Sequence, residues 1–259
     1  MVENIVEKDS FDRTKSVIIT GACGGIGRVL VSQYALSHYH VIAIDKVSPP
    51  EWQGNIDFMQ FDLSDVNNNQ NFREEIKTRI LELIGDNDLE ALINNAAVQV
   101  IKPFEEINYE DWSITLNVNL LAPFFWSQMF LDKLILSNGS VLNISSIHAQ
   151  QTKKQFSVYA TSKAALSSLS KLLAIELGER IRVNVIEPGA ISTQMLENSF
   201  EFNTQGREAL DELQPMKRIG EPIEVAQLAM FLTSNSSKFI NGSAIPIDGG
   251  IRNQLHDPE

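Results

Sequence analysis

The chain alternates two patterns of apolar residues along its length. Short runs rich in Val and Ile carry apolar side chains at consecutive positions, which is typical of strands buried on both faces of a parallel sheet. Longer segments place apolar side chains every three or four residues, which predicts amphipathic helices. We expect strands at 16–20, 40–45, 56–61, 89–93, 139–146, 182–189 (ending in a turn) and 243–247. We expect helices at 29–36, 72–84, 110–136, from about 156, and at 221–232.

This regular alternation predicts the fold class. Strands that alternate with helices indicate a single-domain, Rossmann-like α/β fold, a doubly wound parallel sheet of about seven strands with helices on both faces. We find no internal repeat and no linker-like segment, so residues 1–259 form one domain with tails at 1–14 and 251–259. The second tail shows no clear structure, and the weak periodicity of 192–214 predicts a mobile flap.

The segment 110–136 predicts one long, strongly apolar helix. Asn117, Asn119 and Pro123 interrupt its middle. A polar amide in so apolar a helix is either hydrogen-bonded in the core or functional.

Composition narrows the possible settings and partners. The 33 acidic residues outnumber the 21 basic ones, which argues against binding to nucleic acid or to an anionic membrane. A single Cys excludes an internal disulfide and a Cys-based zinc site, and we expect no metal. Without a secretory apolar region near the start or an apolar run of about 20 residues, we expect a soluble cytoplasmic protein.

A glycine-rich turn follows the first predicted strand, in the sequence Thr20-Gly-Ala-Cys-Gly-Gly-Ile-Gly27. Strand, glycine turn and helix form the context in which such a motif binds phosphate at a helix N-terminus. We expect Gly21 to allow the tight turn, Gly25 to let the backbone approach a pyrophosphate, and Gly27 to let the helix pack on the strand. The alternative is a glycine-rich turn that binds nothing.

Polar residues follow the other predicted strands at their carboxyl ends, where doubly wound sheets bind ligands. Asp45 ends the second strand 24 positions beyond Gly21, about where an acid meets the adenosine ribose. Asp62 and Leu63 follow the third strand, at the expected edge of an adenine pocket. The remaining strand ends carry Asn95, Ser146, Pro188 and Gly189.

Tyr159 and Lys163 lie four residues apart on a predicted helix and so share one face. Ser146 lies 13 positions before Tyr159, at the end of a predicted strand, and its hydroxyl is able to converge on the same volume. Taken alone, a Tyr and Lys at this spacing is a weak signal, because the Lys of such pairs is usually a solvated surface charge.

Taken together, these motifs resemble the short-chain dehydrogenases/reductases over about residues 15 to 250. The matching markers are Thr20–Gly27, Asn94-Asn-Ala-Ala97, Asn119, Ser146, Tyr159-x-x-x-Lys163, Pro188-Gly189 and Asp248-Gly-Gly250, with Ala97 where the family usually has Gly. The resemblance implies a catalytic tetrad of Asn119, Ser146, Tyr159 and Lys163. It implies cofactor contacts from Gly21, Gly24, Gly25, Ile26, Gly27, Asp45, Asp62, Leu63, Asn95, Tyr159, Lys163, Pro188, Gly189, Ile191 and Thr193.

The chemistry expected of this set is transfer of hydride between a nicotinamide and a small-molecule alcohol or ketone. The Lys163 ammonium and an oxidised nicotinamide would both lower the pKa of Tyr159 from its ordinary value near 10, which lets it act as general acid/base. Ser146 would hold the substrate oxygen, and Asn119 would anchor a water in the proton path. Further substrate contacts are expected from His148 and Gln150, together with Ser146 and Tyr159.

Three questions stay open at the level of sequence. The first is the substrate, for which we expect a sugar, polyol or hydroxy acid. The alternative functions are an NADPH-dependent 3-oxoacyl-type reductase and a catalytically silent NAD-binding scaffold or sensor. Asp45 favours NAD over NADP because a carboxylate repels a 2′-phosphate, although Lys46 is the one cation positioned to offset this. Finally, the helices from 110 and from about 156 predict a homotetramer, or at least a dimer, through small residues such as Ala160, Ala164, Ala165, Ser167 and Ser168.

Overall fold

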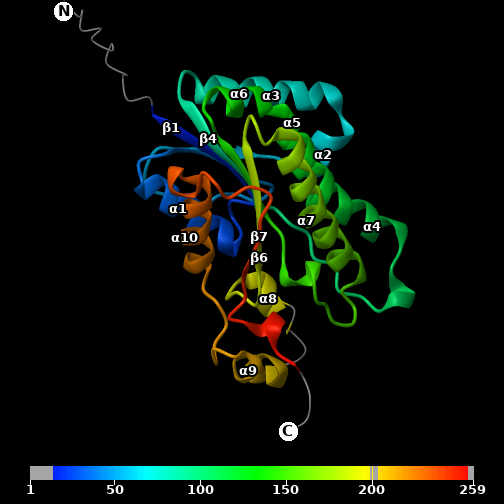
Figure 1. The fold of residues 1–259 in the computed structure, drawn as a ribbon. Coiled ribbons are helices and arrows are strands. Elements are labelled where there is room, and N and C mark those ends of the chain that lie inside the picture. The colour runs from blue at the N-terminus through cyan, green and yellow to red at the C-terminus, as the bar shows by residue number, and fades with distance from the viewer. Residues whose placement is uncertain (1–13, 199, 201–203, 256–259) are drawn as a thin grey trace, which may run out of the picture.

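The computed structural model describes residues 14–198, 200 and 204–255, and within these residues seven parallel strands form one sheet (Figure 1). The strand order is β3-β2-β1-β4-β5-β6-β7. The strands are β1 (Lys15–Thr20), β2 (His40–Asp45), β3 (Ile56–Gln60), β4 (Asp88–Asn94), β5 (Ser140–Ile144), β6 (Arg182–Pro188) and β7 (Ala244–Ile247). The prediction of a doubly wound parallel sheet is therefore confirmed, with boundaries shifted by a few residues at most.

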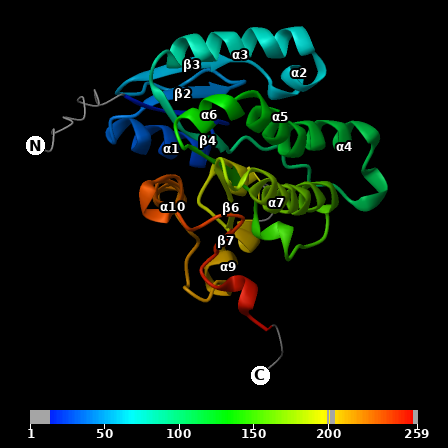
Figure 2. The same cartoon turned by 45° about the horizontal axis from the view of Figure 1, so that its top comes forward.

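Helices cover both faces of the sheet, as Figure 2 shows. The helices α1 (Gly25–Leu36) and α10 (Pro222–Thr233) pack side by side on one face. The other face carries α3 (Gln70–Ile84), α5 (Ala122–Met129), α6 (Leu131–Leu136) and α7 (Ser157–Leu177). Shorter helices complete the chain: α2 (Leu63–Asn68), α4 (Tyr109–Leu116), α8 (Gln194–Asn198), α9 (Thr204–Leu213) and the 3₁₀ turns η1 (Phe104–Glu106), η3 (Ile147–Ala149), η4 (Asn235–Ser237) and η5 (Ile251–Asn253).

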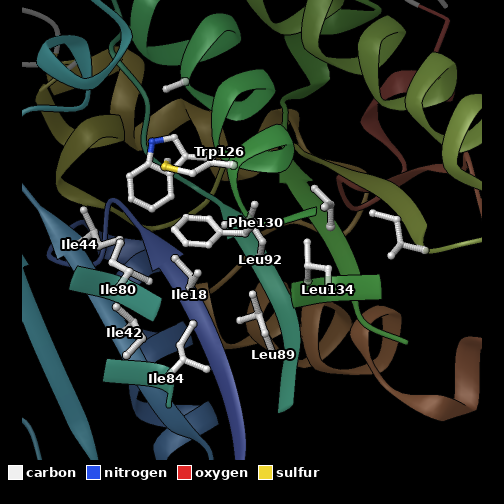
Figure 3. Packing of buried hydrophobic residues seen from close by; sticks show 14 of the residues in the cluster. Ile18, Ile42, Ile44, Ile80, Ile84, Leu89, Leu92, Trp126, Phe130 and Leu134 are labelled. Carbon is white, nitrogen blue, oxygen red and sulfur yellow. The ribbon is translucent and has the colours of Figure 1, made fainter. Parts of the chain in front are cut away.

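Two apolar cores lie on the two faces, because neighbouring side chains of a strand point in opposite directions. On β1, Val17 and Ile19 contact the core beneath α1 and α10, whereas Ile18 contacts the core beneath α3 and α5. In the second core, Trp126 and Phe130 pack over the strands, with ring centroids 5.5 Å apart (Figure 3). This two-sided burial explains why the strands are continuous runs of Val and Ile.

The predicted helix 110–136 is wrong as one unbroken element. The structure has α4, a π-helical turn η2 (Asn117–Leu121), α5 and α6, with a break at Phe130. In the π-helical turn the Ala122 amide donates to the Asn117 carbonyl, five residues back. Pro123 supplies the reason, because it lacks the amide that would bond to the Asn119 carbonyl in an α-helix and its ring would crowd that carbonyl.

Two other segments differ from expectation. The predicted flap 192–214 contains α8 and α9, while residues 199 and 201–203 lie outside the described residues. The C-terminal segment, expected to lack structure, forms η5, and residues 256–259 lie outside the described part. No helix among the described residues is both long enough and apolar enough to cross a membrane.

The topology decides where a ligand binds. The chain runs outward from β1 to β3, then returns to place β4 beside β1. Loops that leave β1 and β4 therefore depart in opposite directions and open a crevice at the carboxyl ends of these strands.

Candidate active site

A cavity of about 790 Å³ opens at the carboxyl ends of the strands. It begins beside β2 and β3 and reaches the segments that follow β5 and β6, so it runs along the carboxyl edge of the sheet. Its lining includes nearly all the residues predicted to bind cofactor or substrate, namely Gly21, Gly24, Gly25, Ile26, Asp45, Asp62, Leu63, Asn95, Ser146, His148, Tyr159, Lys163, Pro188, Gly189, Ile191 and Thr193. Three predicted residues lie outside the cavity wall: Gly27, Asn119 and Gln150.

The glycine turn after β1 is tightly packed and leaves no room for side chains at Gly21 or Gly27. Gly21 has a φ of +65°, a conformation that side chains disfavour, and a Cβ there would lie 2.6 Å from the Cα of Ala96. A Cβ on Gly27 would lie 1.9 Å from the carbonyl oxygen of Gly21. Gly27 therefore has the predicted packing role, beneath the cavity floor.

Gly25 lies at a tertiary contact, in addition to its predicted role of letting the backbone approach a pyrophosphate. A Cβ on Gly25 would lie 2.6 Å from the Cγ2 atom of Thr193, which follows β6 much later in the chain. The missing side chain thus lets the start of α1 meet the loop that carries Thr193, another predicted cofactor residue. Whether a pyrophosphate also approaches here stays a prediction.

The N-terminus of α1 fits a dinucleotide phosphate group. Gly24 precedes the helix without any side-chain cap on the first amides, and Gly24, Gly25 and Ile26 line the cavity. Uncapped amides at a helix N-terminus attract anions because the helix dipole adds to their own hydrogen-bonding capacity. These residues, with the glycines that leave space above them, are the ones that would hold a pyrophosphate.

The β2 end of the cavity holds Asp45 in a fixed orientation. Its Oδ2 accepts a hydrogen bond from the Cys23 amide at 2.8 Å, and its Oδ1 accepts one from the Val47 amide at 3.2 Å. The Lys46 ammonium lies 3.8 Å from the Asp62 carboxylate, on the neighbouring segment after β3. Lys46 therefore has a carboxylate partner within the protein.

Asn95 joins the two loops at the crevice between β1 and β4. Its Nδ2 donates to the carbonyl oxygens of Gly21 at 2.9 Å and Thr20 at 3.2 Å. Its backbone amide donates to the Thr20 hydroxyl at 3.1 Å. Asn95 thus supports the shape of the glycine turn and also lines the cavity.

Ser146, Tyr159 and Lys163 converge as predicted. The Tyr159 hydroxyl is hydrogen-bonded to the Ser146 side chain, which also accepts from the His148 amide at 3.1 Å. The Lys163 ammonium lies 5.8 Å from the Tyr159 ring centroid and donates to the Ile144 carbonyl at 2.7 Å. All three residues are buried, so their polar atoms interact in a medium of low dielectric constant.

Burial shifts both titratable groups of this set toward their neutral forms. It raises the pKa of Tyr159 to about 12, although the hydrogen bond with Ser146 acts in the opposite direction. It also lowers the pKa of Lys163 to about 7. The expectation that Lys163 would lower the pKa of Tyr159 is thus not met by the protein alone, because desolvation is the larger effect. At neutral pH the site holds a protonated tyrosine, which is a proton donor.

Asn119 lies beneath the cavity in the π-helical turn and is fully buried. Its Oδ1 accepts from the Val98 amide at 2.8 Å, and its Nδ2 donates to the Val98 carbonyl and to the Ser162 hydroxyl, both at 2.9 Å. The side-chain amide therefore ties the loop after β4 to α7. Its predicted role in holding a catalytic water stays a prediction.

The loop between Ser146 and Tyr159 places His148 in the cavity wall but turns Gln150 away. Gln150 Nε2 donates to the Glu187 carboxylate at 3.3 Å, so the structure does not bring it to the substrate space. The next residue, Gln151, lines the cavity instead. The His148 ring stacks on Phe156 with centroids 4.4 Å apart, and burial lowers its pKa to about 4, with the nearby Lys153 ammonium adding to the effect.

Sequence reasoning missed an ion pair with a buried carboxylate next to the loop that follows Ser146. Glu187 is fully buried on β6, and Arg252 of η5 donates to it at 3.0 Å and to Asp248 at 2.7 Å. Gln151 donates to the Arg252 carbonyl at 2.6 Å, which joins η5 to the loop between Ser146 and Tyr159. The spacing of Asp248 and Arg252, four residues apart with opposite charge, is the one signal in the sequence that points to this pairing.

Comparison with known proteins gives one consistent family. Residues 21–252 match the family model described as enoyl-(acyl carrier protein) reductase. The chain is similar to L-xylulose reductase of Mesocricetus auratus, with 32% identity over 91% of this chain and 96% of that protein. It is also similar to the 3-oxoacyl-[acyl-carrier-protein] reductase FabG of Thermotoga maritima, with 33% identity over 92% of this chain and 97% of that protein.

Solved structures agree with this assignment at the level of the fold. The aldohexose dehydrogenase of Thermoplasma acidophilum superposes with a TM-score of 0.87 and 28% identity, over 95% of this chain and 97% of that one. A 4-hydroxyisoleucine dehydrogenase complexed with NADH gives a TM-score of 0.83 and 29% identity, over 93% of this chain and 100% of the other. ElxO with NADP bound gives a TM-score of 0.80 and 27% identity, over 93% of this chain and 100% of the other.

Proposed function

The chain belongs to the short-chain dehydrogenases/reductases, and on that basis we propose that it interconverts a secondary alcohol and a ketone with a nicotinamide cofactor and with Tyr159 as general acid/base. The observation that carries this proposal is the convergence of Ser146, Tyr159 and Lys163 on the same cavity as the glycine turn. A helix start suited to phosphate and a proton donor then face one cavity.

A bound nicotinamide would supply or accept the hydride. In the direction of reduction, Tyr159 donates its proton to the substrate oxygen, and burial keeps that proton in place until the oxygen becomes basic. Ser146 holds the same oxygen and stabilises the charge that develops on it. Lys163, held by the Ile144 carbonyl, stabilises the tyrosinate that remains. Oxidation uses the same groups in reverse.

Replacing Tyr159 tests this proposal against the alternative of a silent NAD-binding scaffold. We expect Tyr159→Phe to lower kcat by about 10² to 10⁴-fold or more, because the proton transfer is lost. Cofactor binding and thermal stability should change little, since the ring is retained. Tyr109→Phe, which alters an exposed tyrosine outside the cavity, serves as the control. The assay is absorbance of the reduced nicotinamide across a panel of ketoses, polyols, hydroxy acids and 3-oxoacyl thioesters; turnover unaffected by Tyr159→Phe would contradict the proposed role.

We further propose that NAD is the preferred cofactor. The solved relatives include complexes with NADH and with NADP, so the preference rests on the residues of this chain. Two backbone amides fix Asp45 at the end of β2, where a ribose 2′-phosphate would meet its negative charge. Lys46 lies near Asp62 and would have to leave it to offset that repulsion. A higher kcat/KM with NADPH than with NADH would refute this assignment.

For the substrate we propose a sugar, a polyol or a hydroxy acid. Relatives named for such substrates, L-xylulose reductase and the aldohexose and 4-hydroxyisoleucine dehydrogenases, support this choice. The FabG relative supports the 3-oxoacyl alternative. The same substrate panel separates the two, since a 3-oxoacyl thioester preferred over every sugar and hydroxy acid would favour the alternative.

We also propose that the protein forms a homotetramer or dimer in the cytoplasm. One face of α7 remains exposed in the single chain and carries Ala164, Ser168, Leu172 and Ile175, the last of which is 81% exposed. Ser167, predicted at this interface, instead points inward and donates to Glu187 at 2.8 Å. The single buried Cys23 suits a reducing compartment. Sedimentation of a monomer at micromolar concentration would refute the assembly.

A further inference from the structure

The charges that line the cavity are unevenly divided. Among the described residues of its wall, the carboxylates are Asp45 and Asp62, both beside β2 and β3. The part that includes Tyr159 carries two lysine side chains, Lys153 and Lys163, and no carboxylate. This distribution is unexpected in a chain whose net charge is −12. It indicates that this part of the cavity is suited to an anion.

Lys153 is held where it can contact a substrate. Its ammonium lies 4.8 Å from the ring centroid of Phe156 and 5.4 Å from that of Phe200, and all three residues line the cavity. The Phe156 ring lies 6.2 Å from the Tyr159 ring. Lys153 and Tyr159 therefore both neighbour Phe156 in the wall of the same cavity.

The aromatic rings orient the Lys153 ammonium but do not neutralise it. Cation–π contacts are worth about 0.5–1 kcal/mol at exposed sites, less than a charge-assisted hydrogen bond to a carboxylate. No described residue forms an ion pair with Lys153. Partial burial also lowers the pKa of Lys153, although much of the residue remains exposed to water. Lys163 is different, because it donates to Ile144 and belongs to the catalytic set.

We propose that Lys153 binds the carboxylate of an oxo acid or hydroxy acid whose reacting oxygen lies between Ser146 and Tyr159. The inference rests on the proposed oxidoreductase function and selects the acid among its substrate classes. The apolar residues of the cavity wall suit the aliphatic part of such a molecule: Val98, Phe156, Met195, Leu196, Leu210 and Ile251. Hydroxyls of a sugar or polyol placed against these apolar side chains would lack hydrogen-bond partners there, although Gln151 and other polar residues also line the cavity.

The test compares charged and uncharged forms of the same substrate. Acetoacetate and levulinate are each measured with their methyl esters and with a neutral ketose, using NADH as reductant. The variants are Lys153→Met, Lys153→Arg and the control Lys154→Met, which removes a neighbouring exposed lysine that does not line the cavity. We expect Lys153→Met to raise KM for the acid about tenfold or more and to change KM for the ester less than about twofold. Lys153→Arg should retain most of the affinity, and added salt should raise KM for the acid alone.

The outcomes separate this inference from the proposed function. Two outcomes would overturn the inference and leave the oxidoreductase function intact. In the first, Lys153→Met changes KM equally for the acid and the ester. In the second, a ketose or 3-oxoacyl thioester is preferred over every acid and its turnover is unaffected by the variant. If no substrate is turned over, the function itself fails. Binding of the acids to NADH-loaded Tyr159→Phe protein, followed by nicotinamide fluorescence, then decides the inference. Weaker binding on Lys153→Met supports the carboxylate site, and unchanged binding refutes it.

Discussion

Gly27→Ala is the sharpest test of the contact between α1 and the glycine turn. The added Cβ would lie 1.9 Å from the carbonyl oxygen of Gly21 and 2.9 Å from the Cα of Ala22. Both neighbours are backbone atoms, so no change of rotamer relieves the overlap. The start of α1 has to move away from the turn, and the amides that face the cavity move with it.

The size of the effect follows from two opposing contributions. Overpacking in a well-packed core costs about 1–3 kcal/mol, and a clash with backbone alone belongs at the upper end of that range, about 3 kcal/mol. Alanine inside a helix is favoured over glycine by about 1 kcal/mol, which returns part of the loss. We therefore expect Gly27→Ala to lower the free energy of unfolding by about 2 kcal/mol, and to weaken cofactor binding because the helix start is displaced.

Gly24→Ala is the matched control for the unfolding measurement. Gly24 has a φ of −73°, and a Cβ there would meet only the Gly21 carbonyl oxygen, at 3.4 Å. We expect its free energy of unfolding to lie within about 0.5 kcal/mol of the wild-type value. Urea unfolding of both variants gives the stabilities, and NADH fluorescence titration of Gly27→Ala gives its affinity. Wild-type stability and affinity in Gly27→Ala would show that the turn and helix are not tightly packed.

Three further measurements address other parts of the site. Asp45→Ala should lower the ratio of kcat/KM for NADH to kcat/KM for NADPH. An unchanged ratio would show that Asp45 does not contact the ribose. Arg252→Met leaves the buried Glu187 without its ionic partner and should cost about 3 kcal/mol in urea unfolding, whereas a loss below about 1 kcal/mol would contradict the pairing. Lys163 has a pKa of about 7 in the folded protein and about 10.5 when unfolded, so its charge destabilises the fold fully below pH 7 and progressively less as the pH rises toward 10.5. The unfolding free energy of the wild type relative to Lys163→Met should therefore increase between about pH 7 and 10, and a flat difference would refute the shift.

The elements and the motifs at their ends were predictable because they depend on short-range patterns. Consecutive Val and Ile residues predict strands buried on both faces, and the spacing of Tyr159 and Lys163 places them on one face of a helix whatever the rest of the chain does. Parallel strands bring their carboxyl ends to one edge, so Asp45, Asn95 and Ser146 were expected together. The structure brings all three to one cavity.

Contacts between distant segments were decided by the tertiary structure. Thr193 lies so close to Gly25 that a side chain would not fit there, and no local pattern links these two residues. Gln150 faces Glu187 while Gln151 faces the cavity, because η3 and Arg252 set the direction of that loop. In the same way, the apolar helix 110–136 contains a π-helical turn whose place depends on a single proline and on what Asn119 contacts.

The electrostatics of the site show the same division between local and tertiary information. The sequence predicted Tyr159, Lys163 and Ser146 as reacting groups through the family resemblance, because the spacing of Tyr159 and Lys163 alone is a weak signal. It did not determine the direction of their pKa shifts, because the cost of desolvation depends on how completely the fold excludes water. In the structure both Tyr159 and Lys163 are buried, and desolvation is the largest cause of both pKa shifts. Only the packing of α7 against the sheet could decide that balance, because it removes both groups from water at once.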